Sequence, residues 1–208
     1  MIKIALFDID LTLIKKDSFL LFLLFMIKKE PLRLFFLPYI LFISFLRIFR
    51  LVSMEFFKQS WLLFIKGIEK KKLDALSKVF FERVVKNYVK PGVEDYIDKL
   101  KSEGYAIVFA TASFEFYIKY IKEYFDADYF FGTKIIFKND KASARIDGKN
   151  CKGSEKITRI IQILDKNQID IENSISFSDS KTDLPFLELC SKFFYVNPKK
   201  WEVLKIVE

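Results

Sequence analysis

The sequence of 208 residues contains no histidine and only two cysteines. The lack of histidine excludes Ser-His-Asp triads, Cys-His dyads, histidine zinc ligands and histidine general bases. Cys151 and Cys190 form no metal-binding cluster and require no disulfide, so we expect a reducing compartment. Any catalysis must therefore use carboxylates, lysine, hydroxyl groups and an oxygen-liganded metal such as magnesium.

Hydrophobic runs long enough to span a membrane are also lacking. Residues 18–27 form one uncharged run and residues 34–46 another, and neither reaches the roughly 18 residues that a spanning helix needs. A longer span that tolerates an internal arginine is the less favoured alternative. We expect Pro31 and Pro38 to interrupt any helix there. No cleavable signal peptide is expected either, because the first apolar run is short and carries two aspartates.

The composition favours an anionic partner. The net charge is +8 and half of the residues are apolar, with 25 phenylalanines. This balance suits a nucleic acid, an anionic lipid surface or a phosphorylated substrate, and a non-catalytic membrane-binding module is one alternative. Nucleic-acid binders cluster basic residues on one face. Here the aromatic residues lie mainly in the hydrophobic runs, so no nucleic-acid partner is expected.

Alternating apolar patterns predict an α/β fold. Strands are expected at residues 2–8, 105–110, 174–177 and 193–196, with helices at 73–88, 93–103, 114–125 and 154–164 between them. This alternation predicts a Rossmann-like, largely parallel sheet. Asn139 and Asp140 predict a small β-hairpin over residues 130–146. Ser154 is expected to cap its helix, and Gly104 to end the helix before it.

One hydrophobic segment interrupts this pattern. We predict a catalytic core from residues 1–16 and 89–208, and a hydrophobic helical cap from residues 17–88, inserted after the first strand. The cap helices fit a buried subdomain, or an interfacial hairpin whose basic flanks face anionic head groups. Phe and Leu occupy more than one helical face, so the pattern favours contact of the cap with a membrane surface.

The first strand ends in two aspartates within FDIDLTLI. Successive residues of a strand alternate between its two faces, so Asp8 and Asp10 are expected to point into one site. Their mutual repulsion, together with desolvation, predicts a cation nearby. Turn chemistry at a strand end is the simpler alternative.

Polar groups follow two further strands. Thr111 and Ala112 follow the second strand, and Asp179 and Asp183 follow a later one. Because ligands of parallel sheets bind beyond the carboxyl ends of the strands, these groups are expected to meet, with Lys156 beside them. Such a set suits Mg²⁺ and a phosphoryl group. Taken singly, Thr111 could be an ordinary strand-end hydroxyl, Lys156 a solvated helix lysine and Asp183 a helix cap.

In this order, the four motifs resemble those of the haloacid dehalogenase superfamily of phosphatases. The resemblance implies that Asp8 is the nucleophile and Asp10 the general acid and base. It implies a phosphate site at Thr111, Ala112 and Lys156, and magnesium ligands from Asp8, the backbone carbonyl of Asp10, and Asp179. Asp183 is expected to support that shell or to orient Lys156. Leu11 and Ser178 depart from the pattern, which often has glycine at both positions.

Two stretches narrow the resemblance. Residues 178–187 and Val196-Asn197-Pro198 are similar to the phosphoserine-phosphatase-like subgroup, and PLRLFFLPYILF resembles the cap of the C-type phosphatidylglycerophosphatases. This implies a magnesium-dependent phosphomonoester hydrolase that works through an aspartyl-phosphate. The expected substrate is a lipid phosphate such as phosphatidylglycerophosphate, at the cytoplasmic face of the cell membrane. The alternative is a soluble, cytoplasmic phosphatase for small molecules such as phosphoserine.

Overall fold

The computed structural model describes residues 1–165 and 168–207. A seven-stranded sheet has the order β4-β3-β2-β1-β5-β6-β7. Its strands are β1 (Ile4–Phe7), β2 (Ala106–Phe114), β3 (Tyr129–Lys138), β4 (Lys141–Asp147), β5 (Ile175–Ser178), β6 (Lys192–Val196) and β7 (Val203–Val207). The central pairs β1–β2, β1–β5, β2–β3 and β5–β6 are parallel, whereas β3–β4 and β6–β7 are antiparallel. The predicted α/β fold is confirmed, although the sequence reading missed β7.

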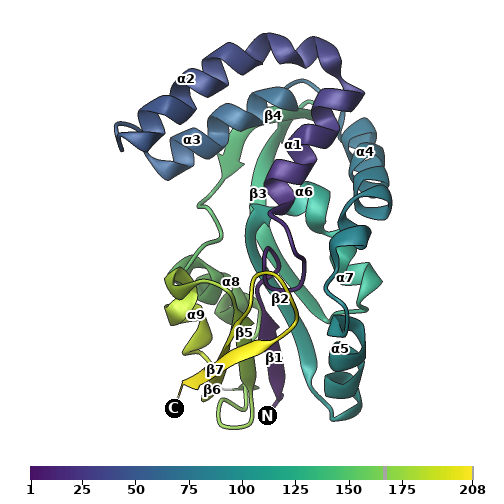
Figure 1. The fold of residues 1–208 in the computed structure, drawn as a ribbon, viewed down its shortest axis with the longest axis vertical. Coiled ribbons are helices and arrows are strands. Elements are labelled where there is room, and N and C mark those ends of the chain that lie inside the picture. Colours follow the sequence, from purple (N-terminus) through teal and green to yellow (C-terminus); the bar gives the residue numbers. More distant parts are fainter. Residues whose placement is uncertain (166–167, 208) are drawn as a thin grey trace.

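The helices divide between the inserted segment and the rest of the chain. The first group is α1 (Ser18–Lys29), η1 (Pro31–Phe36), α2 (Leu37–Ile48), α3 (Met54–Trp61), η2 (Leu62–Phe64), α4 (Lys70–Arg83) and η3 (Val85–Tyr88). The second is α5 (Val93–Ser102), α6 (Glu115–Ile118), α7 (Tyr120–Tyr124), α8 (Ser154–Ile163), η5 (Lys181–Asp183) and α9 (Leu184–Leu187). In Figure 1 the first group lies above and beside the sheet, with α2 as the outermost helix. The division into core and cap at residues 17 and 88 stays a prediction.

The central strands are apolar on both faces. In β1, Ala5 and Phe7 belong to one buried cluster, which includes residues of α1, α4 and α5. Ile4 and Leu6 point the other way, into a second cluster with residues of α8 and α9. This alternation, with helices on both sides, is what a buried parallel strand requires.

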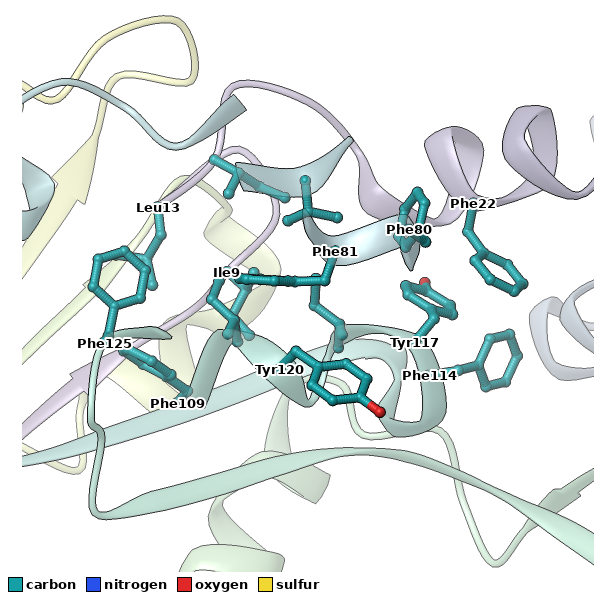
Figure 2. Packing of buried hydrophobic residues seen from close by; sticks show 14 of the residues in the cluster. Ile9, Leu13, Phe22, Phe80, Phe81, Phe109, Phe114, Tyr117, Tyr120 and Phe125 are labelled. Atoms are coloured by element: carbon teal, nitrogen blue, oxygen red, sulfur yellow. The ribbon is translucent and has the colours of Figure 1, made fainter. Parts of the chain in front are cut away.

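Aromatic side chains join the cap to the core, as Figure 2 shows. Phe22 of α1 stacks on Tyr117 with ring centroids 4.6 Å apart, and Phe80 of α4 meets the same ring edge-on. Phe81 and Phe114 belong to the same cluster. The cap therefore packs on the end of β2 and the helix that follows it, directly beside the end of the sheet.

Both prolines of the cap lie at the start of a helix, and only Pro31 follows a break in the helical path. Pro31 and Pro38 lie in the first turns of η1 and α2, where a missing N–H costs nothing. Pro31–Ile48 is consequently one helical path of 18 residues, and by length and composition alone it could cross a membrane. The expectation for Pro31 is confirmed, since α1 ends at Lys29 and a new helix begins at Pro31. The expectation that Pro38 interrupts the helix was wrong, and so was the expectation that no stretch reaches spanning length.

Local signals elsewhere had mixed success. Asn139 and Asp140 both have positive φ, 47° and 57°, as the predicted two-residue hairpin turn requires. Gly104 follows the end of α5 with a φ of 81°. Ser154 does not cap α8: it is the first helical residue, and Gly153 holds the cap position without a side-chain bond.

Candidate active site

The loop after β1 turns sharply at the edge of the sheet. The N–H of Asp8 still donates to the carbonyl of Phe177 in β5, but the N–H groups of Thr12 and Leu13 both turn back to the carbonyl of Ile9. Leu11 has a φ of 60°. The chain thus leaves the extended conformation within a few residues, and the turn, rather than strand alternation, sets the environment of Asp10.

Asp8 is buried at the centre of the site. Its Oδ1 atom lies 2.6 Å from Nζ of Lys156, and its Oδ2 accepts a bond from the hydroxyl of Thr12 at 3.1 Å. The same hydroxyl lies 3.3 Å from Oδ1 of Asp179 and accepts a bond from the N–H of Asp179. Thr12 therefore lies between the two side chains predicted to hold magnesium.

Lys156 is 1% exposed, which excludes the reading of a solvated helix lysine. Its Nζ lies 2.6 Å from Oδ2 of Asp183 as well as from Asp8. Ser178 donates its hydroxyl to that Oδ2 at 3.1 Å. Lys156 thus joins the loop after β1 to the loop after β5, and its bond to Asp183 fits the second of the two roles predicted for that aspartate. Ser178 contributes a hydrogen bond where glycine could give none.

Asp10 has a different set of partners. Its Oδ1 accepts a bond from the backbone N–H of Ser18 at 2.7 Å, and its Oδ2 accepts one from the hydroxyl of Ser113. Thr111 lies 3.5 Å from the same Oδ2. Asp10 thus lies where the first residue of cap helix α1 meets the end of β2.

The two aspartates nevertheless face the same end of the sheet. The charge of Asp10 contributes to the raised pKa of Asp8, so the carboxylates are close enough to interact, although no side chain bonds to both of them in the described hydrogen bonds. The predicted repulsion between Asp8 and Asp10 is therefore present. Their separate partners give the two carboxylates separate surroundings, which suits two different roles.

The backbone carbonyl of Ala112 accepts two hydrogen bonds. That oxygen accepts bonds from Nζ of Lys58, in cap helix α3, and from the hydroxyl of Thr133, both at 2.8 Å. The same two donors also reach Oδ1 of Asn150, each at 2.9 Å. Thr111 and Ala112 lie within β2, near its end, and not after the strand as predicted. A cap lysine therefore bonds both to the end of β2, at the predicted phosphate site, and to the loop that precedes Lys156.

Several of these residues were missed from the sequence. Thr12 was visible as a hydroxyl inside FDIDLTLI. Lys58 and Lys90 gave no signal, since both stand in unremarkable helical or apolar surroundings. Lys90 is almost fully buried, and its Nζ donates to the carbonyls of Leu11 and Asn197 at 2.5 and 2.7 Å. It fixes the turn that carries the two aspartates.

Burial dominates the electrostatics of the site. Desolvation raises the pKa of Asp8 to about 7, against the opposing effect of Lys156. Desolvation also raises the pKa values of Asp10 and Asp179. For Lys156, burial alone would lower the pKa, but the carboxylates of Asp8 and Asp183 raise it. Ionisation of Asp8, Asp10 and Asp179 together is therefore unfavourable unless a further positive charge lies nearby.

The donor set fits a magnesium ion. Across residues 1–165 and 168–207, no group of three or more acidic, cysteine or histidine side chains converges as a metal site. Asp8 and Asp179 share Thr12, so two of the three predicted ligands lie close together, and the carbonyl of Asp10 is the third. Mg²⁺ commonly binds one or two carboxylates and takes its remaining oxygens from water and phosphate. The roles of these residues stay predictions.

Comparisons with known proteins agree with this picture. A family model described as haloacid dehalogenase-like hydrolase matches residues 5–188. A phosphoserine phosphatase of Methanocaldococcus jannaschii is 27% identical over 93 residues, which cover 45% of this chain and 44% of that protein. The aligned part thus spans less than half the length of that relative.

Solved structures share the fold. A protein of unknown function from Bordetella pertussis Tohama I is 21% identical, with a TM-score of 0.81, covering 95% of this chain and 91% of that one. A structure titled as a phospho-aspartyl intermediate analogue of phosphoserine phosphatase is 20% identical, with a TM-score of 0.64, covering 94% and 86%. At these identities the likeness establishes the fold alone.

Proposed function

The chain belongs to the haloacid dehalogenase-like hydrolase family, and from this membership and the site geometry we propose that it hydrolyses phosphate monoesters through an aspartyl-phosphate at Asp8. The observation that carries the proposal is the buried Lys156, held between Asp8 and Asp183 at 2.6 Å from each. A non-catalytic membrane-binding module would have no use for such a costly buried charge cluster. The predicted enzyme class, a hydrolase, is confirmed by the family.

In the first step, a carboxylate oxygen of Asp8 attacks phosphorus. The new bond joins that oxygen to phosphorus, and the bond from phosphorus to the alcohol oxygen breaks. Lys156 holds Asp8 in position and contributes positive charge beside the transferring group. Asp10 protonates the departing oxygen, a role helped by burial, which raises its pKa and favours its protonated form.

In the second step, Asp10 is the base. Having lost its proton, it takes one from a water molecule, which attacks phosphorus. The bond between phosphorus and Asp8 breaks, and inorganic phosphate and the free carboxylate result. Ser18 and Ser113 hold the two oxygens of Asp10 from the cap and the core, so that the proton acceptor stays aimed at one point. Thr111 and the backbone amide of Ala112 are proposed to bind phosphate oxygens.

Magnesium fits this site through Asp8, the carbonyl of Asp10, and Asp179. When bound, it supplies positive charge that offsets the carboxylates and polarises the phosphoryl group. Thr12 sets the spacing of the two carboxylates through its hydroxyl. Asp183 is engaged by Lys156 and Ser178, which supports its predicted role in orienting Lys156.

A small phosphomonoester such as phosphoserine is the substrate that the relatives favour. The curated relative is a phosphoserine phosphatase, and so is one of the structures that share the fold. Of the three proteins compared above, none is a phosphatidylglycerophosphatase. The cap also offers a half-buried cation near the site, since Lys58 bonds to the carbonyl of Ala112 at the end of β2. A carboxylate on the alcohol portion of the substrate could pair with this lysine.

A lipid phosphate is the second candidate. It is favoured by the apolar side chains that the outer surface of η1 and α2 exposes, such as Leu32 and Phe35. A lipid substrate would place the enzyme at the cytoplasmic face of the cell membrane, whereas phosphoserine allows a cytoplasmic protein.

A parallel assay separates these candidates. Phosphate release is measured from phosphoserine and from phosphatidylglycerophosphate in mixed micelles, with and without Mg²⁺, for the wild type and Asp8→Asn. We expect release that needs both magnesium and Asp8, and faster turnover of phosphoserine. Faster turnover of the lipid would reverse the order of the two substrates. Release by Asp8→Asn at the wild-type rate would exclude the proposed mechanism.

A further inference from the structure

The outer face of η1 and α2 carries no charge. Within residues 31–49, every exposed side chain is apolar or, in one case, a tyrosine. We define the apolar ridge as the eight most exposed large apolar side chains of this segment and the turn after it: Leu32, Phe35, Leu41, Phe42, Phe45, Ile48, Phe49 and Leu51. Leu32 and Phe35 are 92% and 84% exposed. Water is an unfavourable neighbour for such a surface.

The charged residues of the same segment lie on its other side. Nη1 of Arg33 donates to the carbonyl of Lys66 at 2.8 Å, and Nη1 of Arg47 donates to the carbonyl of Val52 at 3.3 Å. A surface helix in water normally shows the reverse, with an apolar stripe inward and charges outward. The inverted arrangement indicates that the outer face meets an apolar medium.

The ridge is also large and continuous. Phe42, Phe45 and the C-cap residue Phe49 recur at helical spacing, and Leu41 and Ile48 lie beside them. Helix α1, which contacts η1, and helix α3, which contacts α2, also expose apolar residues: Leu20 and Leu24 of α1, and Met54 and Phe56 of α3. Soluble monomers rarely expose contiguous apolar patches beyond a few hundred Å². The patch therefore needs an occupant.

We propose that the apolar ridge docks in the surface of an anionic lipid bilayer. Residues 18–50 contain five basic residues and a single acid, Glu30, and that acid is already paired with Lys72 at 2.5 Å. Lys28, Lys29 and Arg50 are exposed beside the ridge, where they can meet lipid phosphates. A second copy of this chain would bring the same positive charges into the contact, so like charges oppose that alternative.

The packing of α2 fixes how the ridge lies. Ile40 and Ile43, on the inner face, are buried, and Ile40 shares a small cluster with Leu23 and Phe64. To span the bilayer, α2 would have to expose these contacts. Lying in the membrane plane keeps them and immerses only the outer face, as amphipathic interfacial helices do. The helical path, roughly 30 Å long, then rests along the surface, and Figure 1 shows it as the outermost element of the cap.

Docking would bring the site close to the lipid surface. Helix α1 begins at Ser18, whose N–H bonds to Asp10, and leads directly to η1, which carries the first residues of the ridge. The proposed general acid is thus separated from the ridge by little more than one helix. The docking proposal stands whichever phosphomonoester is the substrate, because it concerns the surface alone.

Flotation of the full chain with lipid vesicles tests the proposal. Flotation is used because vesicle-bound protein floats whereas aggregated protein sediments. Vesicles of phosphatidylcholine alone are compared with vesicles of an equimolar mixture of phosphatidylcholine and phosphatidylglycerol. We expect binding to the anionic vesicles that weakens with added salt. The double variant Phe42→Glu with Phe45→Glu should bind the anionic vesicles with an affinity at least about tenfold lower, because two aromatic side chains no longer enter the interface.

A matched control uses exposed apolar residues elsewhere. The double variant Ile161→Glu with Ile163→Glu changes two exposed isoleucines of α8, a helix outside the cap. It should leave vesicle binding unchanged. Magnesium-dependent hydrolysis of para-nitrophenyl phosphate in solution should be equal in both double variants, which shows that they fold. Absence of this hydrolysis in the wild type and in both double variants would count against the proposed function and not against docking.

Two results would overturn the docking proposal. One is that the wild type does not float with anionic vesicles, or floats as well after the change at Phe42 and Phe45. The other is that the wild type forms a dimer in detergent-free solution and does not bind vesicles, while the same double variant is monomeric. A second copy of the chain would then be the occupant of the ridge. Sedimentation velocity without lipid distinguishes that case.

Discussion

Nζ of Lys156 lies 2.6 Å from Oδ1 of Asp8, and both side chains are almost fully buried. The lysine comes from the first turn of α8 and the aspartate from the end of β1, 148 positions apart in the chain. A buried pair of this kind is costly to form and more costly to break, because a lone charge would remain. The pair therefore ties the stability of the fold to the chemistry of the site.

Replacing Lys156 should lower both the stability of the fold and the activity of the site. Lys156→Met leaves Asp8 and Asp183 facing each other without their shared cation, and we expect a loss of about 3–5 kcal/mol in the free energy of unfolding at neutral pH. Phosphate release should be lost as well. Urea denaturation and a phosphatase assay check these effects.

The control for this change is the same substitution at an exposed lysine. Lys192 begins β6 and is exposed, so Lys192→Met should keep phosphate release and change the free energy of unfolding by less than about 0.5 kcal/mol. A Lys156→Met protein as stable and as active as Lys192→Met would contradict the account.

The raised pKa of Asp8 makes stability depend on pH. In the folded chain burial raises this pKa to about 7, whereas an unfolded aspartate titrates near 3.9. Between these values the folded state holds a proton that the unfolded state has lost, so the free energy of unfolding should fall as the pH rises from about 4 to about 7. Above that range this contribution is constant. Denaturation in the presence of a chelator measures the slope.

The control for this slope is Asp8→Asn. The amide cannot ionise, so the variant should show a shallower fall. Carboxyl groups whose pKa values burial also raises, among them Asp10, Asp179 and Glu115, contribute to the part that remains. A slope as steep in Asp8→Asn as in the wild type would show that Asp8 does not titrate in this range.

Lys58 is predicted to hold the cap to the core. The hydroxyl of Thr133 has a single hydrogen and cannot serve the carbonyl of Ala112 and Oδ1 of Asn150 at the same time. Lys58→Met would leave one of these acceptors without a donor, at a cost of about 1–3 kcal/mol. Chemical denaturation measures this loss. The same change at Lys66, which is exposed in the same segment, should cost less than about 0.5 kcal/mol; equal losses would remove Lys58 from this role.

Leu11 is predicted to tolerate glycine. Its φ of 60° is unfavourable for a residue with a Cβ atom by about 1–2 kcal/mol, and Lys90 holds its carbonyl in place. Leu11→Gly should therefore keep phosphate release and lose little or no stability. Leu13→Gly is the contrasting change, because Leu13 is fully buried and its loss should be strongly destabilising. Inactivation by Leu11→Gly would mean that the leucine side chain itself serves the site.

The sequence predicted those parts of the molecule that depend on local pattern. Alternating apolar residues indicated the strands and the parallel sheet, and Asn139-Asp140 indicated the hairpin. Lys58 and Lys90 could not be found this way, because they bond to backbone carbonyls that are distant in the chain, those of Ala112 and Asn197. Pro38 misled because the same residue that breaks a helix interior is well suited to a first turn.

The most direct test of the account is whether Asp8 carries the phosphoryl group. The wild type and Asp8→Asn are mixed with magnesium and a phosphomonoester labelled in its phosphate, quenched in acid within the first turnover, and digested. The account predicts label on the peptide that contains Asp8 in the wild type and none in the variant, which should remain folded. Label on another residue, or full phosphate release by Asp8→Asn, would contradict it.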